Sequence, residues 1–203
     1  MTLEAGRITT QLLDVMDLVS RAFMIEVDDA YLEQVRAYVQ APITGLVPDA
    51  QKYAERGAHQ LDSALKAYDK ADDKPLWRDY LDASYAELFL GVAPKATEPV
   101  ESCYMNDERV LYAEQFFQVK EIIEKTDYQV PANFHEPVDH IAIEFAFFAH
   151  LVHAGAYDKA NDFRATHMDP WVQSALSDMI DRDDMGFYTG IANLARAIMI
   201  ELG

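Results

Sequence analysis

The chain has 203 residues, half of them hydrophobic and 26% charged, and its 35 acidic and 17 basic side chains give a net charge of −18. This composition excludes a largely disordered chain, and eight glycines with eight prolines are too few for a turn-dense all-β fold. The basic residues are scattered rather than gathered in a stripe, which excludes a free-standing nucleic-acid binder and favours a partner with cationic character.

Apolar residues recur at helical spacing along almost the whole chain. No alternating run predicts a strand, and no repeat of the kind that builds a solenoid is present. We therefore expect an all-α fold, a single globular helical bundle of about nine to ten helices. The stripes place nine of them at approximately 8–23, 29–41, 48–68, 75–90, 107–123, 137–154, 157–163, 170–180 and 188–202.

Two segments interrupt the helical pattern. Residues 92–106 contain Pro94 and Pro99 and form the longest connection, which predicts a binding loop. The polar segment 126–137 predicts a hinge between helical subdomains 1–125 and 138–203. If this hinge extends, the C-terminal helices can dock onto a second chain, so we expect a monomer with a domain-swapped homodimer fraction.

The N-terminal segment gives no sign of export or anchoring. Asp14 and Asp17 interrupt its leucines, so it lacks the apolar stretch of a signal peptide or membrane anchor. The single cysteine, Cys103, excludes an intrachain disulfide and any zinc site with several cysteine ligands. We expect a cytoplasmic protein.

The residues that could carry catalysis or bind a cofactor lack the necessary neighbours. The glycines occur singly and form no phosphate loop, and Gly186 with Gly190 indicates close helix packing. Nothing around Cys103 resembles a nucleophile signature, so we interpret it as a buried, inert thiol. No Glu-x-x-His pair exists for a di-iron site. We expect no catalytic residue, no metal and no cofactor, with the remaining histidines solvated or satisfied in the core: His59, His150, His153 and His167.

The pattern of residues 134–145 predicts the start of a helix. Pro137 suits the first helical position, with Glu136 at the cap and Asp139 placed to reach back to the cap's N–H. The positive end of the helix should keep His140 neutral. The face of this helix that carries Glu144, Phe147 and Leu151 either packs inside the protein or lines a groove; the sequence leaves both open.

At these residues the sequence resembles the TorD/DmsD family of redox-enzyme maturation chaperones, whose hallmark Glu-Pro-x-Asp-His stands here at 136–140. Four further motifs follow the family's order: Tyr85-x-x-Leu88-Phe89-x-Gly91, Pro99 to Tyr104, Phe163-x-x-x-His167-x-x-x-Trp171, and Gly186-Phe187-Tyr188. The sequence departs from the family at Val100, where some members have Trp, and at Met168-Asp169. These departures affect partner specificity rather than membership.

The resemblance implies a chaperone rather than an enzyme. Such a protein binds the twin-arginine (Tat) signal peptide and/or the apo form of an exported molybdoenzyme, of the TMAO or DMSO reductase type, until its cofactor is inserted. The positions matching the family's peptide-recognition residues are Tyr85, Leu88, Phe89, Pro99, Tyr104, Glu136, Pro137, Asp139 and His140.

Three of these residues could instead have a purely structural role. Leu88 and Phe89 suit a hydrophobic core, and Asp139 suits a helix cap. The alternatives in function are a nucleotide-binding or hydrolytic helical protein and a purely structural swapped dimer. Asp139 and His140 are a poor hydrolytic dyad, because adjacent helical residues point about 100° apart.

Overall fold

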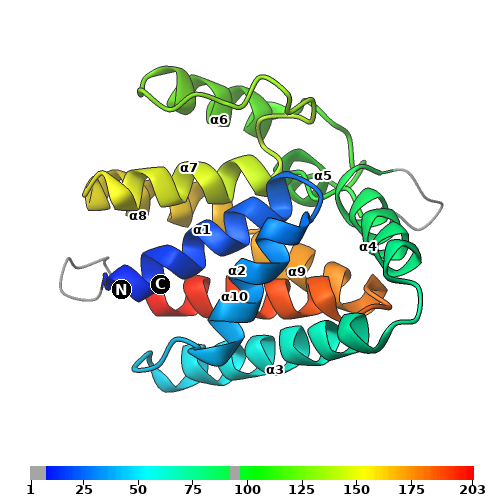
Figure 1. Cartoon of the computed structure of the whole chain (residues 1–203). Helices are drawn as coiled ribbons and strands as arrows, with labels where there is room; N and C mark the ends of the chain where they lie inside the picture. The colour runs from blue at the N-terminus through cyan, green and yellow to red at the C-terminus, as the bar shows by residue number, and fades with distance from the viewer. Residues whose placement is uncertain (1–7, 92–96) are drawn as a thin grey trace. The chain divides into compact units, whose positions relative to one another are not determined.

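The structure is a computed structural model that describes residues 8–91 and 97–203 (Figure 1). This part of the chain holds helices and no β-strand, which confirms the predicted all-α fold; a single isolated bridge joins Val100 and His140. The ten α-helices and one π-helix are α1 (Thr10–Met24), α2 (Asp29–Gln40), α3 (Pro48–Lys70), α4 (Lys74–Phe89), α5 (Glu101–Met105), α6 (Glu114–Glu124), α7 (Ile141–His153), α8 (Tyr157–Phe163), η2 (Arg164–Met168), α9 (Val172–Arg182) and α10 (Phe187–Leu202).

The helices form two compact units, and each unit combines two stretches of the chain. Unit 1 consists of the residues up to Met24 together with Glu98–Ala175, and unit 2 consists of Ile25–Thr97 and Leu176–Gly203. The predicted hinge at 126–137 lies inside unit 1, so no boundary between the units falls there. Exchange of helices between chains through this segment stays a prediction.

In unit 2, α3 packs along α10, the cyan and red helices of Figure 1. Two glycines face each other at this contact. A Cβ built on Gly57 would lie 2.8 Å from the carbonyl oxygen of Gly190, and one built on Gly190 would lie 2.7 Å from Leu61 Cγ. The two helices can therefore approach this closely only with glycine at both positions, which confirms the packing role predicted for Gly190.

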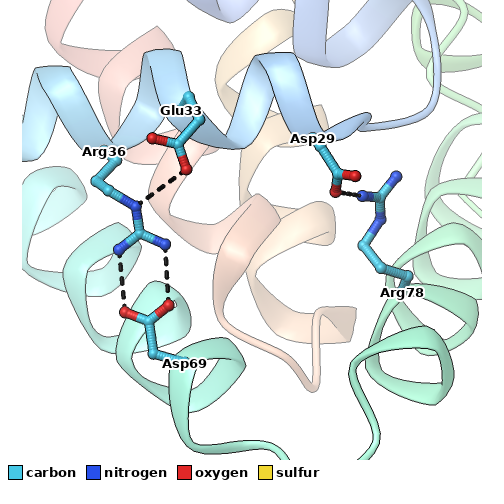
Figure 2. Close-up of polar contacts among 5 residues, drawn as sticks. All are labelled: Asp29, Glu33, Arg36, Asp69 and Arg78. Carbon is cyan, nitrogen blue, oxygen red and sulfur yellow. Dashed lines mark hydrogen bonds and ion pairs between the residues drawn. The ribbon is translucent and has the colours of Figure 1, made fainter.

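Ion pairs tie α2 to its neighbours in unit 2 (Figure 2). Arg36 donates two hydrogen bonds of 3.0 Å to the carboxylate of Asp69 on α3, and a longer one of 3.4 Å to Glu33 on its own helix. Arg78 on α4 reaches Asp29 at the start of α2. A two-pronged arginine–carboxylate pair fixes geometry better than a single contact, so these pairs set the register of α2 against α3 and α4.

In unit 1, α1 packs against α7, with the rings of Phe23 and Phe145 edge to face at 5.4 Å. Ten of the thirteen residues of α7 are buried, including Phe147 and Leu151 on its second face. That second face is thus buried inside unit 1, and Phe147 and Leu151 on it also line a pocket. A helix that is apolar on all sides belongs in a protein core.

Two predicted boundaries are wrong. The predicted loop 92–106 contains the short helix α5 in its described part, while residues 92–96 lie outside the described residues. The next helix, α6, begins at Glu114 rather than at residue 106 or 107, because the backbone turns there with positive φ at Arg109 and Tyr112. Within the described residues, no helix has the length and apolar character needed to cross a membrane.

Candidate functional site

The Glu136–His140 segment is not the first turn of a helix, as predicted, but a turn that pairs with a distant loop. His140 N donates to Pro137 O at 3.0 Å, which closes the turn, and α7 begins only at Ile141. The backbone N–H of Glu101 donates to Asp139 O, and that of Ile141 donates to Pro99 O, each at 2.8 Å. The backbone groups of this segment therefore form hydrogen bonds with residues 99–101 rather than within a helical turn.

The cap of α7 is His140, not Glu136. Its Nδ1 accepts a hydrogen bond of 3.2 Å from the backbone N–H of Ala142, so Nδ1 itself carries no proton. The ring is buried and stands edge to face with Phe134 at 5.5 Å. Asp139 and His140 thus turn to different partners, which leaves them unable to act as an acid–base pair in this arrangement.

Asp139 caps a helix other than its own. Its Oδ2 accepts a hydrogen bond of 3.0 Å from the backbone N–H of Ser102 and a second one from the Ser102 hydroxyl. Ser102 lies in the first turn of α5, where free backbone N–H groups and the positive helix end favour a carboxylate. Asp139 is fully buried; burial raises its pKa, and the bonds from Ser102 oppose that rise.

Below this turn lies a set of buried ionisable groups, the carboxyl cluster, formed by Glu101, Asp139, Glu144 and His167. Glu101 Oε2 lies 3.0 Å from His167 Nδ1, and Glu144 Oε2 accepts from Trp171 Nε1 at 3.1 Å. None of the four side chains is more than 2% exposed. The three carboxyl groups are therefore shielded from solvent in this arrangement.

The pKa values of the carboxyl cluster are shifted by its burial in the core. Burial raises the pKa of Glu144 well above its usual range, and the negative charges of Glu101 and Asp139 raise it further. Burial also raises the pKa of Glu101, while the hydrogen bond with His167 lowers it. The raised pKa favours the neutral form of Glu144 in the folded protein, which reduces the cost of burying a further unpaired charge.

Cys103, on α5, is buried as predicted. Burial, with help from the carboxylate of Glu98, raises the pKa of its thiol to about 11. A thiol in this state is a poor nucleophile at neutral pH. Among the described residues, no group of three His, Cys, Asp or Glu side chains is placed to hold a metal ion.

Unit 1 also contains a pocket of about 380 Å³ between α6, α7, α8 and η2. Its walls are apolar, from Ile122, Phe147, Leu151 and Phe163, and charged side chains including Lys125, Lys159 and Asp162 stand around them. His167, on the π-helical turn η2, connects the pocket to the carboxyl cluster. Such a cavity suits a few apolar side chains or a small molecule.

The predicted recognition residues fall into two groups. Pro99, Pro137, Asp139 and His140 meet in unit 1 and are buried, whereas Tyr104 and Glu136, also in unit 1, are half-buried and reach solvent. The ring of Tyr104 packs on Trp171 at 5.3 Å.

Tyr85, Leu88 and Phe89 lie on α4 in unit 2 and are at most 4% exposed. The rings of Tyr85 and Phe89 pack on Tyr188, at 6.2 and 5.4 Å. Leu88 and Phe89 therefore occupy the core of unit 2.

The five motifs of the resemblance thus form two groups, one in each unit. Residues 99–104, 136–140 and 163–171 meet around the carboxyl cluster of unit 1, and residues 85–91 meet 186–188 in unit 2. Glu144, which lies outside every motif, was missed as a member of the cluster. The available signal was a lone carboxyl within an otherwise apolar helical run.

Comparison with known proteins identifies relatives of this chain. The nitrate reductase delta subunit family matches residues 48–177, which is more than half of the chain. A chaperone protein TorD from Shewanella sp. strain MR-4 is 27% identical over 188 residues, covering 90% of this chain and 88% of that protein. The TorD of Shewanella oneidensis is 30% identical over 122 residues, covering 58% and 56%, and that of Shigella boydii is 24% identical over 192 residues, covering 91% and 90%. The chain therefore belongs to the nitrate reductase delta subunit family, among the TorD/DmsD redox-enzyme maturation chaperones.

Proposed function

We propose that this chaperone binds the twin-arginine signal peptide of an exported molybdoenzyme, and/or the apo form of that enzyme, in the cytoplasm. It holds the client until the cofactor is inserted and catalyses no reaction itself. Family membership and the relatives named chaperone protein TorD support this role. The oligomeric state that we expect is the monomer with a swapped dimeric fraction.

One observation carries the proposal: an acidic chain encloses an apolar pocket in unit 1. A twin-arginine signal peptide begins with a cationic segment and continues with an apolar one. The net charge of −18 attracts the cationic segment over long range, and the pocket walls of Phe147, Leu151 and Phe163 accept apolar side chains. The protein therefore complements both parts of such a peptide.

The nine predicted recognition residues divide by accessibility. Tyr104 and Glu136 reach solvent and are proposed to touch the peptide directly. The seven buried residues are proposed to act by holding the binding surface in shape. Asp139 shows how this works, because its bonds to Ser102 fix α5 and with it Tyr104.

The test uses the complete client. The chain is mixed with an apo-molybdoenzyme carrying its signal peptide, with the same enzyme lacking the peptide, and with an unrelated Tat precursor. Complexes are detected by size exclusion with light scattering. We expect a stable complex with the first, a weaker or absent one with the second, and none with the third. Failure to bind either form of any molybdoenzyme would contradict the proposal.

A further inference from the structure

Residues 105–117 form the most apolar exposed surface of unit 1. This segment, called the apolar turn, runs from the end of α5 into the first half of α6. Among the described residues nine large hydrophobic side chains are exposed, and five of them lie here: Met105, Val110, Leu111, Tyr112 and Phe117. Single exposed hydrophobic residues are ordinary, but a concentration of them marks an interaction surface.

The backbone of the apolar turn is held in a costly conformation. Arg109 and Tyr112 have φ of 50° and 59°, and they are the non-glycine residues with positive φ in the described part of the chain. Left-handed conformations of this kind cluster at binding and active sites, where the surrounding structure enforces them. Here they turn the Val110–Tyr112 stretch toward solvent.

The apolar turn is fastened to the carboxyl cluster through Asn106. Its side-chain amide donates to Ser102 O at 2.9 Å and accepts from Val110 N at 3.3 Å, while its backbone carbonyl accepts from Arg109 N at 3.2 Å. Ser102 is in turn bonded to Asp139. A chain of hydrogen bonds thus runs from the buried Asp139 to the exposed hydrophobic side chains, so their presentation is built into the fold.

Charge decides which kind of partner fits. Asp107, Glu108 and Glu114 are exposed in the apolar turn, while the guanidinium of Arg109 lies 5.3 Å from the centre of the Tyr104 ring. A second copy that docked on this surface would also carry −18 and be repelled, as would an anionic membrane surface. A polypeptide that joins an apolar stretch to a cationic end is attracted by both features.

We propose that the apolar turn is the surface on which the apolar segment of the client signal peptide docks, with its arginine end beside Asp107 and Glu108. This inference rests on the proposed function and assigns its location. The pocket of about 380 Å³ holds only a few side chains, so a longer apolar segment needs further surface. The predicted residues Leu88 and Phe89 do not provide this surface, because each is only 1% exposed.

The test compares two matched double variants by fluorescence anisotropy, using a labelled peptide with a twin-arginine start and a complete apolar segment. Leu111→Ser with Phe117→Ser removes two side chains of the apolar turn that are 43% and 62% exposed. Leu76→Ser with Tyr80→Ser removes two from α4 that are 46% and 58% exposed, as the control. Circular dichroism and thermal melts verify that both variants fold.

We expect the first variant to weaken peptide binding by about tenfold or more, because it loses two side chains that the bound peptide would cover, and the control to match the wild type. Unchanged affinity in the first variant, or equal weakening in both, would overturn the location while the proposed function stands. A wild-type dimer that the first variant dissolves would assign the surface to self-association and overturn it too. If the wild type binds no such peptide, the signal-peptide part of the proposed function falls together with this location, and only binding of the apo enzyme remains as the proposed function.

Discussion

The carboxylate of Asp139 accepts a hydrogen bond of 3.0 Å from the backbone N–H of Ser102, which lies 37 residues earlier in the chain. This contact makes Asp139 the cap of α5 and joins the 136–140 motif to the 99–104 motif. It also supports the apolar turn, because Ser102 and Asn106 share the next hydrogen bond. Hydrogen bonds thereby link a buried acid to an exposed surface that it does not touch.

Removing this acid should destabilise the protein. We expect Asp139→Ala to lower the free energy of unfolding by about 2–4 kcal/mol, because the backbone N–H and the hydroxyl of Ser102 both lose a buried acceptor. Urea denaturation measures the change. The exposed Asp107→Ala, in the same unit, should shift stability by less than about 0.5 kcal/mol. Equal stability of the two variants would show that Asp139 is not the cap described.

The raised pKa of Glu144 predicts that the stability of the protein depends on pH. The pKa of Glu144 is raised in the folded protein, whereas in the unfolded chain it is about 4.3. Between these two values the folded state binds more protons, so the free energy of unfolding falls as the pH rises through this window. Glu144→Gln keeps an acceptor for Trp171 and cannot titrate.

We therefore expect the Gln variant to match the wild type near pH 4 and to become relatively more stable as the pH rises toward 8. Denaturation at a series of pH values measures this. The exposed Glu121→Gln serves as the control; the hydrogen bond from Lys125 lowers the pKa of Glu121, so its dependence has the opposite sign. Parallel curves for Glu144→Gln and the wild type would contradict a raised pKa.

The glycine contact between α3 and α10 gives a prediction with a clear sign. In an open helix Gly→Ala stabilises by about 1 kcal/mol. At Gly57 the new Cβ would lie 2.8 Å from both the carbonyl oxygen of Gly190 and a methyl group of Leu194. We expect Gly57→Ala to destabilise unit 2 by about 1–3 kcal/mol, because backbone cannot move aside as a side chain can. A rise in melting temperature would contradict this packing.

Sequence reasoning succeeded where local pattern decides the structure. The stripes of α3 and α10 placed both helices within two residues of their observed ends. The carboxylate of Asp28, a residue type that commonly caps helices, accepts from Tyr31 N at 2.7 Å at the start of α2. Apolar spacing and a capping residue are local signals, and they are strong when no distant group competes for the backbone.

Sequence reasoning failed where contacts between residues far apart in the chain determine the structure. Proline and acidic residues at 136–139 suit a helix start, but the backbone there bonds to residues 99–101. Tyr112 and Phe116 have helical spacing, yet Tyr112 is held at positive φ by a turn that Asn106 closes. The carboxyl cluster was also out of reach, since the burial of Glu101 depends on His167, 66 residues further along. No periodicity encodes such pairs.

The most direct measurement is a calorimetric titration of the wild-type protein with a twin-arginine signal peptide, at low salt and at about 0.5 M NaCl. Salt screens the attraction between the arginines and the acidic surface, with a Debye length of about 10 Å at 0.1 M and less at 0.5 M, but leaves apolar burial intact. We predict clear binding at low salt that weakens and remains measurable at high salt. Absence of binding at low salt, or its complete loss at high salt, would contradict a site that joins acidic and apolar surface.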